Sequence, residues 1–166
     1  MGQVLSYPEW EAGVPSEIVE DALWKVAAYR LALFAADTGW TDVQRLAAAH
    51  ITRSLADQLY RALGSIGANI AEGYSRSTGR DRARFFEYAL GSARESRDWY
   101  YKARHVLSDP VMEHRLELLT RIVKLLIVTI PQQRNSGIRE PGGHYEPMDE
   151  MQWLTTTPAP ITEHHS

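Results

Sequence analysis

Apolar residues recur at intervals of three and four positions through most of this chain, and this spacing restricts its fold more than any other feature. Leu23, Val26, Ala27, Leu31 and Phe34 are one such series. Side chains spaced in this way share one face of an α-helix, which must be buried against another element. Alternating strand patterns are absent from the sequence. The pattern predicts four helices: from Ser16 to a stop at Gly39, from about Thr41 to Glu72 with room for one break, from about Arg80 to Leu107, and from Asp109 to Pro131.

Short connections between these helices favour an all-α, antiparallel up-down-up-down four-helix bundle over residues 16–131. We expect residues 1–15 to form an extended N-terminal lead-in. Residues 132–166 are rich in turn formers and helix breakers, and we expect a largely irregular acidic tail there. The tail also holds an apolar group, for which packing back onto the bundle is favoured over docking to a partner. Its members are Tyr145, Met148, Met151, Trp153 and Leu154.

Several classes of function lack their sequence signatures. Among 166 residues there is no cysteine, no glycine-rich phosphate loop and no Glu-x-x-His spacing of a di-iron bundle. His114 and Glu117 lie three residues apart, and we expect them to be solvated rather than bound to metal. We therefore expect no enzyme activity, no catalytic residues, no metal and no cofactor. The apolar runs are too short to span a bilayer, which favours a cytoplasmic protein without a membrane partner.

Charge is distributed unevenly along the chain, whose net charge is -3. Residues 50–105 carry ten basic and six acidic side chains, a local excess of +4. Residues 1–40 have a net charge of -4 and residues 132–166 a net charge of -3. A basic middle flanked by acidic ends is compatible with nucleic-acid binding, although the average charge alone would argue against it.

The densest basic segment joins the second and third predicted helices. It contains Arg76, Arg80, Arg82 and Arg84 within nine residues. Arginine side chains match the geometry of phosphate, and a helix N-terminus near Arg80 adds partial positive charge. These four residues are therefore predicted to contact a nucleic-acid backbone, with Arg53 and Arg61 of the second helix contributing on the pore or groove side of an oligomer. The alternative is that they pair with nearby acids or with an acidic face of another subunit.

A polar line follows one side of the second predicted helix. Asp57, Arg61, Ser65 and Asn69 are spaced by four residues, and Glu72 follows three later. An apolar stripe occupies another side, so this helix has two faces suited to burial and predicts a homo-oligomer. Asn69 and Glu72 are expected to support the turn at Gly73 rather than to contact a ligand.

These residues also carry a family resemblance. The stretch Ser65-Ile66-Gly67-Ala68-Asn69-Ile70-Ala71-Glu72-Gly73 resembles the signature of the four-helix-bundle 23S rRNA intervening-sequence proteins. The resemblance covers about residues 18–130 and marks Ser65, Asn69, Glu72, Gly73 and Glu95 as structural motif positions. It implies a homopentameric barrel. A related branch, the accessory variability determinant of diversity-generating retroelements, binds nucleic acid and a reverse transcriptase.

The sequence and the resemblance together lead to one expectation of function. The chain is expected to be a non-catalytic, oligomeric accessory protein of bacterial type. It would bind structured nucleic acid, RNA rather than DNA, with a reverse transcriptase as a candidate partner. The alternative is an adaptor or scaffold that docks an effector protein through the bundle and the C-terminal tail, without touching nucleic acid.

Overall fold

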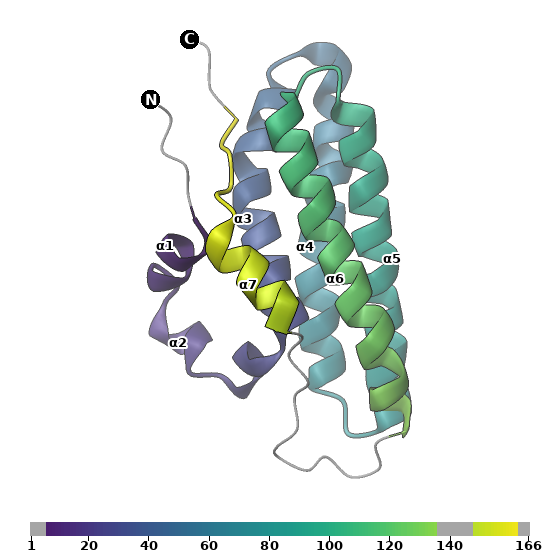
Figure 1. Ribbon diagram of the computed structural model, residues 1–166. Helices are drawn as coiled ribbons and strands as arrows, with labels where there is room; N and C mark the ends of the chain where they lie inside the picture. The colour runs from purple at the N-terminus through teal and green to yellow at the C-terminus, as the bar shows by residue number, and fades with distance from the viewer. Residues whose placement is uncertain (1–5, 136–147, 163–166) are drawn as a thin grey trace.

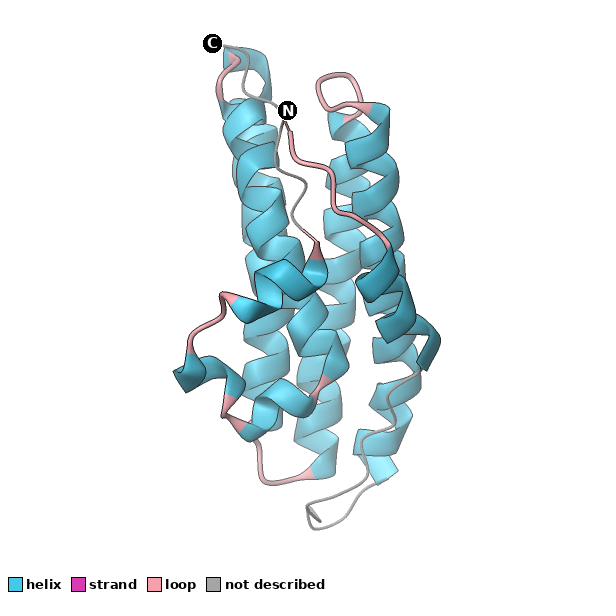
Figure 2. Cartoon of the chain, turned by 60° about the vertical axis from the view of Figure 1, so that its left-hand side comes forward, coloured by secondary structure: helices cyan, strands magenta, loops and turns pink. Residues whose placement is uncertain are grey.

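The computed structural model of the protein describes residues 6–135 and 148–162. Four long helices lie side by side in it (Figure 1): α3 (Ala27–Ala47), α4 (Arg53–Tyr74), α5 (Gly79–Ala103) and α6 (Asp109–Asn135). Because the connections are short, each helix runs opposite to the one before it. Each packs against the next, and α3 also contacts α6. The predicted all-α bundle is confirmed, and Figure 2 draws no strand in the described part of the chain.

The apolar stripes of the four helices form one core. In α4, Leu59, Leu63, Ile66 and Ile70 are each no more than 1% exposed, as is Phe86 in α5. Burial of one such large side chain contributes about 1.5–3 kcal/mol to folding. The spacing by threes and fours therefore predicted both the helices and their inward faces.

Gly39 does not end a helix, as its residue type had suggested. It lies inside α3, which continues to Ala47, and the interruption comes at residues 48–52 instead. A Cβ atom at Gly39 would lie 2.5 Å from Cδ1 of Leu63 and 3.1 Å from the hydroxyl oxygen of Tyr100. The glycine is there because α3 approaches its neighbours closely, and a missing side chain serves that purpose without breaking the helix.

The N-terminal segment is folded rather than extended. Residues Tyr7–Ala12 form α1, which begins with a capping box between Ser6 and Glu9. Trp10 is buried with its ring centroid 5.2 Å from that of Phe34 in α3. The predicted lead-in was therefore wrong for residues 7–12. Ser16 likewise begins only the short α2 (Ser16–Val19), and one 3-10 turn (Ala22–Lys25) precedes α3.

The C-terminal segment also departs from the expected irregular tail. Helix α6 continues through Pro131 to Asn135, and Met148–Thr156 form α7. Pro131 has no backbone N–H to donate to the carbonyl of Ile127. Because both residues are exposed, water can donate to that carbonyl instead. Leu154 and Ala159 are 1% and 0% exposed, which confirms packing onto the bundle. Tyr145 and the side chains of Met148 and Met151 lie outside the described residues.

In the part of the chain that the structure describes, no helix has the length and apolarity needed to cross a bilayer.

Candidate nucleic-acid interface

The predicted arginine cluster lies at one end of the bundle, where α4 turns into α5. Thr78 caps α5, accepting a hydrogen bond from the backbone N–H of Asp81 at 3.1 Å. Arg76 precedes this cap, and Arg80 and Arg84 follow it one helical turn apart, so the latter two lie on one side of α5. All three side chains are exposed. The end of the bundle therefore presents three guanidinium groups to solvent.

Two of these arginines are held by aromatic rings. The Arg76 guanidinium lies 4.7 Å from the ring centroid of Phe85 and pairs with the Glu72 carboxylate. Arg84 lies 5.7 Å from the ring centroid of Tyr88, and its Nε donates to the Tyr88 hydroxyl at 3.0 Å. These contacts leave the guanidinium groups at the surface while restricting their positions.

Arg82 does not belong to this surface, contrary to the prediction. It is 2% exposed. Its Nε donates to Oε1 of Gln133 at 3.0 Å, and its Nη1 donates to the carbonyls of Arg76 and Ser77 at 3.2 and 3.1 Å. Arg82 thus fastens the α4–α5 connection to α6. A helix places every third or fourth residue inward, and residue 82 falls on the same side as the buried Phe86.

Arg53 and Arg61 are exposed but are not brought to the cluster. Arg53 begins α4 and Arg61 lies within it, whereas Arg76 follows its last turn. At 1.5 Å per residue, Arg53 is about 30 Å and Arg61 about 20 Å from that end. A single phosphate group therefore cannot contact either of them together with Arg76.

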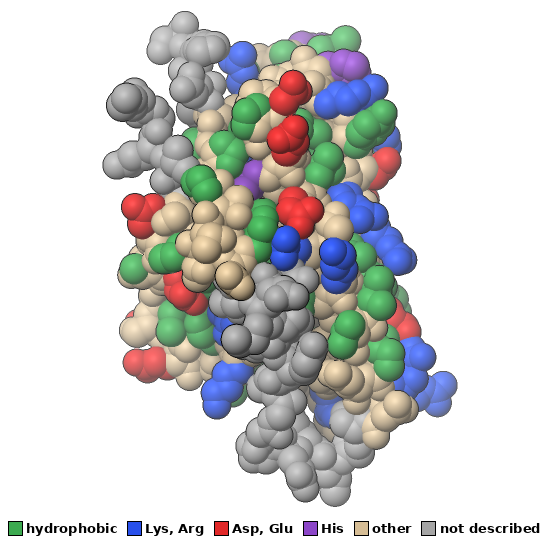
Figure 3. Space-filling view, in the orientation of Figure 1, with side chains coloured by type: hydrophobic (Ala, Val, Ile, Leu, Met, Phe, Trp, Pro, Cys, Tyr) green, Lys and Arg blue, Asp and Glu red, His purple; other side chains and the backbone are tan. Residues whose placement is uncertain are grey.

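Acidic side chains moderate the charge at this end. Glu72 pairs with Arg76, and Glu87 pairs with Arg134 of α6. Arg76 therefore follows the alternative expectation, in which the arginines pair with nearby acidic side chains. Exposed pairs of this kind contribute about 0–1 kcal/mol, so a phosphate group can compete for the arginine. Figure 3 shows basic and acidic side chains interspersed on the face that carries α6 and α7, with no extended area of one sign there.

The family-motif residues make local contacts. Nδ2 of Asn69 donates to the carbonyl of Ser65 at 2.8 Å, and Glu95 accepts from Nε1 of Trp99 at 3.1 Å. A Cβ atom at Gly73 would lie 2.9 Å from Cβ of Phe85. Gly73 therefore permits the close approach of α4 and α5 just before α4 ends.

A buried polar centre lies elsewhere in the bundle, and sequence reasoning missed it. Asp42 of α3 is 0% and Arg115 of α6 1% exposed, and Nε of Arg115 donates to Oδ2 of Asp42 at 2.7 Å. The Tyr100 hydroxyl also donates to Oδ2 at 2.7 Å, and Thr162 donates to Oδ1. Arg115 further donates to the carbonyl of Pro160 at 2.8 Å. The centre therefore joins three bundle helices to the C-terminal segment.

The ionisation of the groups around this centre follows from burial. Burial and the adjacent Asp42 raise the pKa of Tyr100 well above its ordinary value. Burial, and then the positive Arg115, lower the pKa of His114 to about 3. Nδ1 of His114 lies 2.8 Å from Nη1 of Arg115 and must accept, because guanidinium only donates. His114 is thus buried and neutral, not solvated as we had expected.

The sequence contained a signal for this centre. Asp42 and Arg115 occupy positions at which the apolar spacing requires a buried side chain, between Gly39 and Leu46 and between Val111 and Leu118. A charged residue at such a position needs a buried partner.

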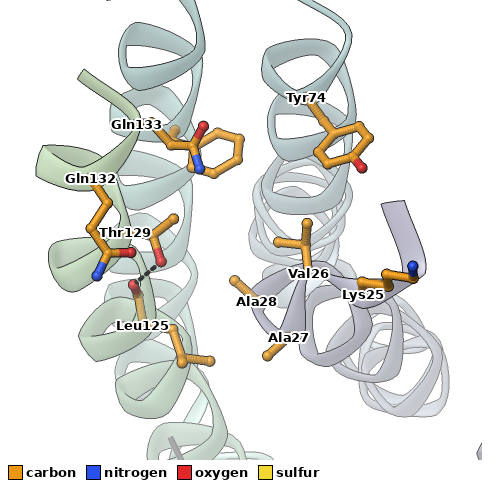
Figure 4. A pocket seen from close by; sticks show the side chains of 10 residues that line it. Lys25, Val26, Ala27, Ala28, Tyr74, Leu125, Thr129, Gln132 and Gln133 are labelled. Atoms are coloured by element: carbon orange, nitrogen blue, oxygen red, sulfur yellow. Dashed lines mark hydrogen bonds between the residues drawn. The ribbon is translucent and has the colours of Figure 1, made fainter. Parts of the chain in front are cut away.

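A small cavity lies near the α4–α5 end of the bundle. This cavity, drawn in Figure 4, has a volume of about 50 Å³ and lies between the start of α3 and the ends of α4 and α6. Val26, Tyr74 and Gln133 are among its lining residues, and Thr129 donates to the carbonyl of Leu125 at 2.7 Å. Such a volume accommodates one or two water molecules, far below the several hundred Å³ of an organic ligand site.

Comparison with known proteins places this chain in a family. Residues 36–128, more than half of the chain, match the family model described as 23S rRNA-intervening sequence protein. The chain belongs to this family. The matched residues extend from within α3 almost to the end of α6, so the family core is the bundle itself, whereas α1, α2 and α7 lie outside the match.

A solved structure supports the fold. It is a protein of unknown function from the S23 ribosomal protein family of Bacteroides thetaiotaomicron, 24% identical to this chain, with a TM-score of 0.58. The similarity covers 63% of this chain and 98% of that one. Comparison with curated proteins found no match. Neither the description of the family nor that of the solved protein names a reaction.

Proposed function

We propose that this protein is a non-catalytic, oligomeric accessory protein that binds structured nucleic acid, RNA rather than DNA. The observation that carries the proposal is the exposed group Arg76, Arg80 and Arg84 at the α4–α5 end. We call these three residues the arginine end. Its guanidinium groups are exposed, and those of Arg76 and Arg84 lie against aromatic rings, which leaves their N–H groups available to bind phosphate. Arg82 is not part of the proposed contact.

The preference for RNA rests on the family. Its description refers to sequences that intervene in 23S rRNA, which connects relatives of this chain with RNA. A reverse transcriptase, an enzyme that copies RNA, is one protein partner compatible with this preference. The proposal therefore includes a reverse transcriptase as a partner and a bacterial cytoplasmic location.

Oligomer formation is a further component of the proposal. Trp40 of α3 and Tyr60 of α4 form an edge-to-face pair, with ring centroids 5.4 Å apart, yet they are 48% and 45% exposed. Large aromatic side chains left exposed beside each other are typical of surfaces that become buried on association. A ring of copies, five by family resemblance, would repeat the arginine end around its axis. Light scattering giving a mass of 18.8 kDa, that of one chain, would contradict this component.

Salt dependence tests the RNA contact. Binding of a structured RNA, measured by filter retention at 50 mM and 200 mM salt, should weaken steeply because each neutralised phosphate releases counterions. With three arginines engaged in one copy, we expect a loss of roughly tenfold or more over this range. Binding that is tight but unchanged by salt would contradict a contact made by arginine and phosphate. A variant of the chain with R76A, R80A and R84A should lose both the affinity and the salt dependence.

A further inference from the structure

The arginine end carries two aromatic rings that the charge argument does not use. Phe85 and Tyr88 lie in the second and third turns of α5, with ring centroids 5.6 Å apart and their planes at 85°. Arg76 lies over the ring of Phe85 at 4.7 Å, and Arg84 lies against that of Tyr88 at 5.7 Å. The four side chains form a continuous series in the order Arg76, Phe85, Tyr88 and Arg84. We call this series the arginine–aromatic ladder.

The ladder lies at the surface. Tyr88 is 48% exposed, and Phe85 is half-buried. Phe85 anchors the series, because its Cβ lies where α4 and α5 approach each other at Gly73. Tyr88 has no such role in the core. A large ring of this kind, next to guanidinium groups and half open to solvent, is suited to contact with a flat ligand surface.

Flat faces and phosphates occur together in single-stranded nucleic acid. In a duplex each base is covered above and below by its neighbours, so only base edges and the backbone are accessible. An unpaired base exposes its face and can stack on an aromatic ring or a guanidinium plane, while its phosphate binds an adjacent arginine. Arg80, one turn before Arg84 on the same side of α5, is placed to bind such a phosphate.

We propose that the arginine–aromatic ladder binds unpaired nucleotides, in a loop or a single-stranded flank of a structured RNA, by stacking a base on Tyr88. The proposal rests on the proposed function, since it names the kind of nucleotide that the same surface takes. Stacking uses the ring face, which every base has, so recognition is tolerant of sequence. The duplex part of the RNA contributes phosphate contacts only.

The chain offers a matched control on the same helix. Tyr101 is 57% exposed, and the Arg104 guanidinium lies 4.2 Å from its ring centroid. It is the same type of pair as Tyr88 with Arg84, but it lies about 20 Å away along α5. Y88A and Y101A each remove one exposed ring, whereas Y88F keeps the ring and removes the hydroxyl.

The test uses fluorescence anisotropy with two RNAs that share one stem, of which one has a ten-nucleotide unpaired loop and the other is a blunt duplex. We expect the looped RNA to bind more tightly. Y88A should lose about tenfold to a hundredfold in affinity for it, the range expected for removal of one base stack. Y101A and Y88F should stay within about threefold of the unaltered chain, and circular dichroism should show equal helix content in all variants.

Two results would overturn the ladder. One is equal affinity for the looped and blunt RNAs, and the other is equal affinity of Y88A and Y101A for the looped RNA. If binding still depends on Arg80 and Arg84 in either case, the proposed function stands and only the ladder fails. If neither RNA binds, the proposed function fails as well.

Discussion

At the scale of single residues, the buried polar centre shows how charge is accommodated in this core. A buried ion pair is stable only when its remaining donors and acceptors are also satisfied. Asp42 meets that condition through Arg115, Tyr100 and Thr162. His114 completes the arrangement by accepting from Arg115, so its neutral form belongs to the folded state.

His114 therefore predicts a pH dependence of stability. Its pKa is about 3 in the folded protein against 6.5 unfolded, so below pH 6.5 the unfolded state binds more protons. The contribution of the neutral ring is complete above pH 6.5 and is lost as the pH falls toward 3. Urea unfolding at pH 7 and pH 4.5 should show a loss of about 2–3 kcal/mol that is absent in H114Q. An equal loss in H114Q would contradict this origin.

Gly39 and Gly64 form a second pair of contrasting residues, both in helix interiors. At Gly39 a Cβ atom would meet Leu63, which is itself buried, whereas at Gly64 nothing lies within 4 Å. G39A should destabilise the protein by about 1–3 kcal/mol through overpacking. G64A should stabilise it by about 0.5–1 kcal/mol through higher helix propensity. Urea unfolding of both variants measures these changes in stability. If G39A stabilised the protein, α3 and α4 would not be in close contact at Gly39.

At the scale of elements, the sequence predicted well wherever local spacing decides the outcome. The helix from residue 80 and the helix from residue 109 begin within one residue of their predicted starts. The errors occurred where residue type and tertiary contact disagree. Gly39 and Pro131 are helix breakers by propensity, but close packing in one case and exposure to water in the other keep them within helices.

The same reasoning explains what the sequence could not show of the candidate site. Spacing placed Arg76, Arg80 and Arg84 together, because a few residues and one helical turn separate them. Spacing also placed Arg82 in this group, but it did not predict that Arg82 is buried. The burial depends on tertiary contacts, with two carbonyls of the α4–α5 turn and with the Gln133 amide of α6. Arg53 was assigned to nucleic-acid contact by charge alone, and the length of α4 separates it from the cluster.

The C-terminal segment provides a test at this scale. Leu154 of α7 is 1% exposed, whereas the neighbouring Thr155 is exposed. L154A should lower the free energy of unfolding by about 2–5 kcal/mol if α7 is part of the core. T155A should change it by less than about 0.5 kcal/mol, as surface substitutions do. If the two variants unfolded at the same urea concentration, α7 would not be contributing to stability.

At the scale of the whole molecule, the uneven charge of the sequence becomes a spatial arrangement. The end of the bundle at the α4–α5 connection carries the arginine end and the arginine–aromatic ladder. The polar centre joins α3, α5 and α6, and the C-terminal segment is bound to it through Pro160 and Thr162. The family core is the bundle, and the elements outside it are held to that core by Trp10, Leu154 and the contacts to Asp42. Stability and proposed binding thus rest on different residues.

The most direct test of the proposed function compares two variants with equal charge changes at the two ends of α5. R80A/R84A removes two positive charges from the arginine end, and K102A/R104A removes two from the opposite end, about 33 Å away. Affinity for the same looped RNA at low salt should fall about tenfold or more in the first variant and stay within about threefold in the second. Equal affinities for the two variants would contradict the account, because RNA would then not be bound at the arginine end.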